Sequence, residues 1–250
     1  MRIKQAAIAI LFPAISFCQN GSVIFPASTG VSVENIRFEK QSRIAFLRIV
    51  NTSTKDVTGL NLSIEVTYQN GQYHYERVLD FAAKMVSAQK AGLGDNGALH
   101  PGTTLEERLD LPIRGGLDNR PLAVTAQVDL VAYTDLLVEG NNEPALSRLV
   151  SLRKNRILAD QKAAELINEA AANSVTPNPG GVAVSQLRAL LEQAKRKEGE
   201  HELETELMAI IEDLERSGPE VSRGYLRQYA TGKFRDSAAM APHSELRRSR

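Results

Sequence analysis

Residues 43–72 read RIAFLRIVNTSTKDVTGLNLSIEVTYQNGQ, and this stretch decides the fold of the first half of the chain. Over residues 60–68, apolar side chains alternate strictly with polar ones. A period of two with one apolar face is typical of a half-buried β-strand. The polar run 51–56 predicts a turn before this strand, and Asn70-Gly71 predicts a hairpin turn after it. The stretch therefore indicates antiparallel strands joined by short turns.

Strand patterns recur on both sides of this stretch. They lie at residues 31–39, 44–50, 73–81, 105–113, 124–132 and 136–139. Turn residues separate them at intervals of about ten residues, which is typical of a sandwich rather than of a parallel α/β sheet. We therefore expect an α+β chain in which residues 23–140 form an antiparallel, immunoglobulin-like β-sandwich of about seven strands. A helical C-terminal region is expected to follow it.

Part of this region resembles a known family. In residues 47–68 an apolar strand ends at Asn51-Thr52-Ser53, and the next strand begins after Gly59. This arrangement resembles small bacterial extracytoplasmic sandwich modules of the FxLYD kind. Residues 99–103, Leu-His-Pro-Gly-Thr, are similar to the Pro-Gly turn that those modules place before a strand. The resemblance covers residues 31–139 and implies a binding or spacer module without known catalytic residues.

The N-terminus has the pattern of a secretory signal peptide over residues 1–18. Arg2 and Lys4 precede an apolar run of 12 residues, and polar residues follow at once. A membrane-spanning helix needs about 20 residues, so the run is too short to span a bilayer. We expect cleavage after Cys18 and an exported, periplasmic or extracellular protein without a transmembrane span in its mature chain. The alternatives are a lipid anchor on Cys18, although bulky Phe17 departs from that pattern, and a buried N-terminal strand or helix.

Composition argues against several functions. Lys and Arg together number 30, and so do Asp and Glu. The chain therefore has no net positive charge that would favour binding to nucleic acid. There is no Trp, and aromatic residues make up 5% of the chain, which disfavours stacking platforms for sugars or single-stranded nucleic acid. Cys18 is the single cysteine. Its removal with the signal peptide would leave no disulfide, thiolate nucleophile or cysteine metal ligand.

The periodicity of the second half is helical. Asn142 can cap a helix, and apolar residues recur every seven positions, which predicts a helix over 142–173. Two prolines and two glycines within residues 174–182 predict a linker. A helical region over 183–216 follows, with two apolar stripes about 160° apart on an ideal helix. Either Gly199 kinks or breaks this region, or its two ends contact different partners.

The second stripe of this region is the candidate interaction surface. It consists of Leu203, Leu207, Ile210 and Leu214, and we expect it to bind a protein partner or a second copy of the chain. Residues 217–250 hold seven Lys or Arg and three Asp or Glu, with few apolar groups. We expect a mobile basic tail there, either solvated or in contact with an anionic partner.

Motifs for catalysis or cofactor binding are weak. Residues 92–97 match GxGxxG, but Pro101 follows where the dinucleotide motif requires a helix. Residues 87–90 and 151–154 fit SxxK without the companion motifs of the acylating enzymes. The four histidines have no ligand spacing. We therefore expect no catalytic, cofactor-binding or metal site, and no small-molecule cofactor.

These observations favour an exported, non-enzymatic interaction or structural protein. The sandwich would act as a binding module or as a spacer. The helices would mediate assembly with a partner or a second copy. The alternative is an envelope chaperone or assembly factor that adds a client strand to an edge of the sandwich. The third hypothesis is a hydrolase with spatially assembled Ser, His and Asp, for which no motif exists.

Overall fold

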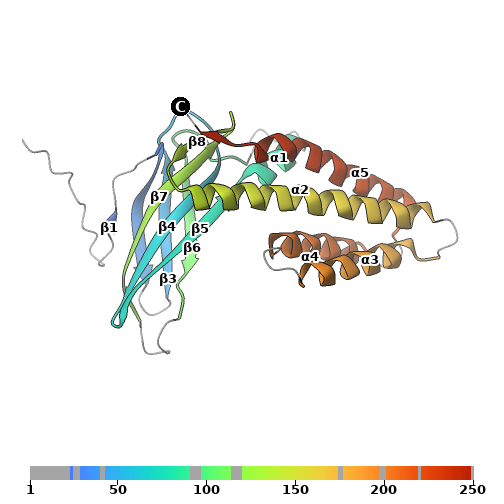
Figure 1. Cartoon of the computed structure of the whole chain (residues 1–250), viewed down its shortest axis with the longest axis horizontal. Helices are drawn as coiled ribbons and strands as arrows, with labels where there is room; N and C mark the ends of the chain where they lie inside the picture. Colours follow the sequence, from blue (N-terminus) through green and yellow to red (C-terminus); the bar gives the residue numbers. More distant parts are fainter. Residues whose placement is uncertain are drawn as a thin grey trace, which may run out of the picture. The chain divides into compact units, whose positions relative to one another are not determined.

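Strands fill the first half of the chain and helices the second (Figure 1). The computed structural model describes residues 23–24, 29–39, 43–90, 97–113, 120–173, 177–196, 201–218 and 221–248. The predicted signal peptide with Cys18, most of the GxGxxG match and Gly199 lie outside the described residues. The α+β class and the helical C-terminal half are confirmed.

The described strands form two sheets. The strands are β1 (Val23–Ile24), β2 (Val31–Glu39), β3 (Ile44–Asn51), β4 (Val57–Tyr68), β5 (Gly71–Asp80), β6 (Thr104–Asp110), β7 (Pro121–Tyr133), β8 (Leu137–Gly140) and β9 (Arg247–Arg248). A six-stranded sheet has the order β5-β4-β7-β8-β9, with β1 also paired to β7. A three-stranded sheet has the order β2-β3-β6, and both of its pairings are antiparallel. In the larger sheet β1 runs parallel to β7, and β9 runs parallel to β8.

The helices follow the sheets in sequence, apart from one that lies between β5 and β6. They are α1 (Ala82–Lys90), α2 (Glu143–Ala172), α3 (Pro179–Ala194), α4 (His201–Arg216) and α5 (Arg223–Met240), with the 3₁₀ helix η1 (Ala241–Ser244) at the end. Helix α2 falls within the predicted range 142–173. Its cap is the predicted one, because the Asn142 side chain accepts a hydrogen bond from the Ala145 amide at 2.9 Å.

Two boundaries differ from the sequence prediction. The linker predicted to reach residue 182 ends earlier, because α3 begins at Pro179. Proline is well suited to the first helical position, and the Asn178 side chain accepts a hydrogen bond from Gly181 N at 2.8 Å. The helical region predicted over 183–216 consists of two helices, α3 and α4.

The largest difference lies at the C-terminus, where α5, η1 and β9 occupy the predicted mobile tail. Ser222 caps α5 by accepting a hydrogen bond from Tyr225 N at 3.1 Å. Four residues are buried along one side of the helix: Leu226, Ala230, Ser237 and Met240. Two of these four are small residues of little hydrophobicity. The apolar stripe was therefore too faint for the sequence to predict a helix.

The chain divides into two compact units. The first comprises Met1–Thr54, Asn61–Arg77 and Pro101–Asp129, and the second comprises Lys55–Leu60, Val78–His100 and Leu130–Arg250. Strands β4, β5 and β7 each contribute residues to both units. Helices α2 to α5 therefore share a unit with residues 55–60, 78–100 and 130–140, which precede them in the sequence.

In the first unit, β4 has the predicted alternation over residues 62–68, whereas Asn61, which was expected on the polar face, is fully buried. Leu62, Ile64 and Val66 are fully buried, whereas the residues between them are half-buried. The Tyr68 hydroxyl donates a hydrogen bond to the Pro112 carbonyl at 2.5 Å. Each side chain on the inward face thus lies in the interior or has a hydrogen-bond partner.

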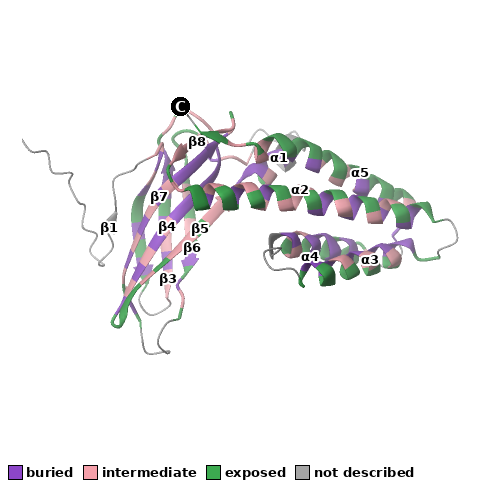
Figure 2. Ribbon diagram, viewed as in Figure 1, coloured by how far each residue is buried: buried purple, intermediate pink, exposed green. Residues whose placement is uncertain are grey.

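In the second unit, residues from α2 to α5 form one hydrophobic core (Figure 2). Its largest members are Ile167, Leu187, Leu191, Leu203, Leu207, Ile210, Ile211, Leu214 and Leu226. Helix α2 contributes mainly alanines: Ala159, Ala163, Ala164, Ala170 and Ala171. Because these side chains are short, neighbouring helices can pack close to α2, and its apolar stripe looks thin in the sequence.

Candidate functional site

The predicted interaction stripe lies inside the helical unit. Leu203, Leu207, Ile210 and Leu214 are each at most 2% exposed and belong to its hydrophobic core. They pack within the chain and present no surface to a partner, which corrects the expectation that they form an exposed stripe. The spacing identified an amphipathic helix correctly, but it could not say that α2 and α3 supply the apolar neighbours.

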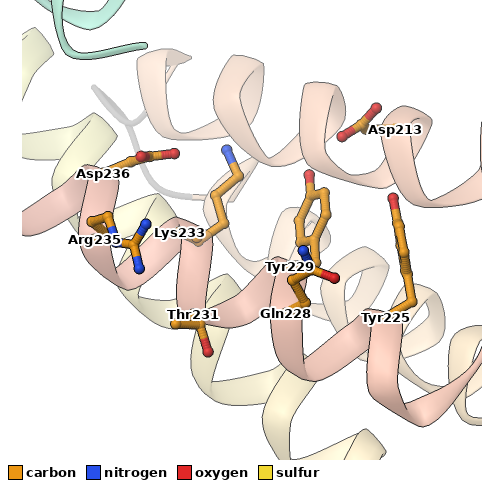
Figure 3. Close-up of a pocket in the computed structure, with 9 residues that line it drawn as sticks. Asp213, Tyr225, Gln228, Tyr229, Thr231, Lys233, Arg235 and Asp236 are labelled. Atoms are coloured by element: carbon orange, nitrogen blue, oxygen red, sulfur yellow. The ribbon is translucent and has the colours of Figure 1, made fainter. Parts of the chain in front are cut away.

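The surface of the helical unit instead carries a groove of about 700 Å³ along α5, with α4 on its other side (Figure 3). Its lining includes Asp213, Tyr225, Gln228, Tyr229, Lys233, Arg235 and Asp236. All but Asp213 come from α5, from successive turns of one side of the helix. Gly232 also lines the groove, and its missing side chain leaves room above the helix backbone.

Two tyrosines form an aromatic patch in the groove. Tyr225 and Tyr229 are one helical turn apart, with ring centroids 6.1 Å apart and ring planes tilted by 36°. The Tyr225 hydroxyl lies 3.0 Å from Ser217 Oγ, and the residue is 39% exposed. Burial, and then the nearby Asp213 carboxylate, raise the pKa of Tyr229. Tyr229 therefore remains a protonated hydrogen-bond donor and is unsuited to act as a general base.

A buried ion pair supports the inner wall of the groove. Lys233 Nζ lies 2.9 Å from Asp160 Oδ1 on α2, and Asp160 is only 5% exposed. Burial raises the pKa of Asp160, and Lys233 opposes this rise by stabilising the charged form. Lys233 Nζ also lies 6.0 Å from the ring centroid of Tyr229. The lysine is thus held by the protein itself.

Two polar side chains on the outer wall remain available. Gln228 and Arg235 are exposed, and within the described part of the chain their side chains have no hydrogen-bond or ion-pair partner. Tyrosine and arginine, which both line this groove, are residue types that often dominate protein interfaces. The groove therefore presents an aromatic ring and two unpaired polar side chains at the surface of the helical unit.

A second polar cluster surrounds Arg153, which is fully buried on α2. Its Nη2 donates to the Thr58 carbonyl and to Asp80 Oδ1, each at 2.8 Å. Its Nη1 donates to the His243 carbonyl at 2.7 Å. Burial, and then the nearby Arg153, lower the pKa of His243. The sequence shows Arg153 only as an interruption of an apolar stripe, so this cluster was not predicted.

The motif residues whose side chains the structure describes do not assemble into a site. Ser151 and Lys154 of one SxxK match are both exposed on α2. His74 is exposed on β5, and His100 Nδ1 is 2.8 Å from Asp56 Oδ1. Among the described residues, no three His, Cys, Asp or Glu side chains are placed to hold a metal ion. No helix in the same set is both long and apolar enough to cross a membrane.

Comparisons with known proteins do not identify a family. No protein-family model matches the sequence. No curated protein matches it. A solved structure of a hypothetical protein from Peptoclostridium difficile 630 aligns with 47% of this chain and 89% of its own, at 10% identity and a TM-score of 0.30. A similarity at this level carries no argument about fold or function.

Proposed function

We propose that this chain is an exported, non-enzymatic interaction protein that binds a protein partner in the groove between α4 and α5. The supporting observation is the combination of an exposed Tyr225 ring with the unpaired side chains of Gln228 and Arg235 on one wall. Tyrosine and arginine are enriched among the residues that contribute most to binding energy. Export is supported by the signal-peptide pattern of residues 1–18.

The groove is organised before a partner arrives. The Tyr225 hydroxyl lies 3.0 Å from Ser217 Oγ, and the Asp160–Lys233 pair holds the inner wall. Ordering a flexible side chain at an interface costs about 0.5–1.5 kcal/mol, so prior ordering favours affinity. Arg235 and Gln228 would then supply the directional contacts to the partner.

In this proposal the β-rich part of the chain is an immunoglobulin-like sandwich of the FxLYD kind, acting as a spacer or a second binding module. The end strands of its three-stranded sheet support this role over strand addition. The ladder between β2 and β3 contains a bulge between Val33 and Asn35, and Glu34 Oε2 lies 3.6 Å from Arg48 Nε. On β6, Arg108 and Asp110 form an exposed ion pair. Bulges and charges are devices that discourage the pairing of an edge with another chain.

A photo-crosslinking amino acid at position 228 tests the proposal in the native envelope. We expect it to capture one partner, which is then purified and its affinity measured. The same amino acid at Gln193, which is exposed on α3, is the matched control and should not capture that protein. Tyr225→Ala combined with Arg235→Ala should weaken binding of the purified partner at least tenfold, as expected for two interface anchors. Unchanged affinity in this variant would refute the groove as the binding site.

A further inference from the structure

The last residues of the chain lie against the edge of β8, where Figure 1 marks the C-terminus. We call residues 241–248 the C-terminal strap. The β9 part of the strap runs parallel to β8, with Arg247 opposite Leu137 and Arg248 opposite Val138. The Arg247 amide donates a hydrogen bond to the Leu136 carbonyl at 2.8 Å. The strap thus occupies a sheet edge that would otherwise present unpaired backbone groups.

Side chains of the strap contact an apolar cluster and polar groups next to β8. Leu246 packs against a small hydrophobic cluster of Leu130, Ala132, Val138, Ala145 and Leu149. Arg248 Nη1 donates to the Gly140 carbonyl at 2.9 Å, and its guanidinium forms an ion pair with Glu143. The edge of β8 therefore recognises an extended segment with an apolar residue two positions before an arginine.

A further bond fastens the start of the strap. The His243 carbonyl accepts a hydrogen bond from the fully buried Arg153. This bond and those of Arg247 and Arg248 run to the segment 136–153, whereas the connection to α5 is the single 3₁₀ turn η1. The strap is thus held mainly by its contacts with residues 136–153, and only η1 joins it to α5.

The same contacts are available between two molecules. Extended, the eight residues of the strap reach about 28 Å at ~3.5 Å per residue, far enough to leave their own β8. A segment that fits its own chain also fits a second copy, because the two recipient sites are identical. Attachment within one chain is favoured by an effective concentration of roughly millimolar, which exchange between two chains must overcome.

We propose that the edge of β8, together with Glu143, is a docking site for the C-terminal strap of a second copy, so that two chains associate by reciprocal exchange of residues 241–248. Each chain then fills the β8 edge of the other, and each Arg153 binds the His243 carbonyl of the other copy. This association uses residues different from those of the groove on α5.

A charge exchange between Glu143 and Arg248 tests the proposal. In Glu143→Arg, two positive charges, at residues 143 and 248, face each other within one chain. In Arg248→Glu, two negative charges face each other at the same two positions. A mixture of the two variants matches charges only between chains. In an exchanged heterodimer, the arginine introduced by Glu143→Arg meets the glutamate introduced by Arg248→Glu. The Arg248 that the first variant retains meets the Glu143 that the second variant retains. We expect light scattering after size exclusion to find each variant monomeric alone and a heterodimer in the equimolar mixture.

The double variant Glu143→Arg/Arg248→Glu is the matched control, since its charges agree within one chain. It should form dimers in the same proportion as the wild-type chain at the same concentration and should melt at the wild-type temperature, whereas the single variants melt lower. A mixture that stays monomeric would overturn the proposal. Dimers formed equally well by either single variant alone would also overturn it, because the association would then be independent of this ion pair.

Discussion

Arg153 on α2 and Asp80 at the end of β5 form an ion pair whose side chains are 0% and 4% exposed. Asp80 Oδ1 accepts hydrogen bonds from Nη2 at 2.8 Å and from Nε at 3.0 Å. The same guanidinium binds the carbonyls of Thr58 and His243. One side chain thus joins β4, β5, α2 and η1 within the second unit.

Removal of Arg153 is therefore expected to be costly. Arg153→Met keeps much of the side-chain volume but leaves Asp80 buried without its cation. Breaking one side of a buried pair typically costs about 3–5 kcal/mol, and we expect a loss of free energy of unfolding in this range. Urea unfolding followed by circular dichroism measures the change.

Two variants control for this result. Arg153→Met/Asp80→Leu removes both charges and should recover much of the loss, because no charge remains buried. Lys195→Ala removes the exposed pair with Glu192 on α3 and should leave the free energy of unfolding unchanged within error. If Arg153→Met were no less stable than Lys195→Ala, the pair would not be a structural element.

Gly59 gives a second test of the same region, because its surroundings leave no room for a side chain. A Cβ at this position would lie 2.9 Å from Arg153 Nη2 and 3.0 Å from Leu149 Cδ2. Both neighbours are fully buried, so they have little freedom to move away. We expect Gly59→Ala to lower the free energy of unfolding by about 1–3 kcal/mol, the usual cost of overpacking.

Gly224 on α5 provides the matched substitution. A Cβ there would find Ser222 Oγ as its nearest neighbour, at 3.8 Å. Gly224→Ala should leave stability unchanged or raise it by up to ~1 kcal/mol, since alanine favours the helix. Equal destabilisation by the two variants would show that the loss at residue 59 does not come from crowding.

The sequence predicted elements whose pattern is local. The alternation in β4 and the cap at Asn142 both depend on neighbours a few residues away, and both are present. The Arg153 cluster was not predictable in this way, since Thr58, Asp80 and His243 lie 95, 73 and 90 residues from Arg153. From the sequence alone, an arginine within an apolar stripe indicates only that the stripe is interrupted. Its burial can be recognised only when its distant hydrogen-bond partners are known.

The groove was missed for a different reason. Tyr225, Tyr229 and Lys233 recur at the four-residue spacing of one helix face, and this spacing is visible in the sequence. The surrounding residues were assigned to a mobile tail because the buried face of α5 consists partly of Ala230 and Ser237. Small buried residues contribute little to hydrophobic periodicity, although they pack as closely as large ones.

Leu207 distinguishes a core role from a partner-binding role for the predicted stripe. It is fully buried among residues of the helical core, so Leu207→Ala should cost about 2–5 kcal/mol of unfolding free energy. The neighbouring Met208 is 41% exposed, and Met208→Ala should have a much smaller effect. Thermal and urea unfolding of both variants measure the difference. Similar small losses in both would mean that Leu207 is not part of a packed core.

His243 makes stability depend on pH, because burial and Arg153 lower its pKa below the ordinary value of 6.5. Below this value the unfolded chain binds a proton that the folded chain does not, so the free energy of unfolding falls as the pH drops through about 6.5. Above 6.5 the imidazole is neutral in both states and has no effect. Asp160 acts in the opposite sense, because its raised pKa stabilises the folded chain as the pH falls.

Comparison of His243→Gln with the wild-type chain isolates the contribution of this histidine from that of Asp160. We expect the wild-type chain to lose more stability than His243→Gln between about pH 7.5 and about pH 5.5, because only the wild-type chain carries this proton linkage. His74→Gln, at an exposed histidine on β5, controls for the loss of one imidazole. Since His243 lies within the C-terminal strap, acid should also lower the hydrogen-exchange protection factor of the Arg247 amide, which corrects for the slower intrinsic exchange at low pH. If the free energy of unfolding depended on pH equally in the wild-type chain and in His243→Gln, the pKa of His243 would not be lowered in the folded state.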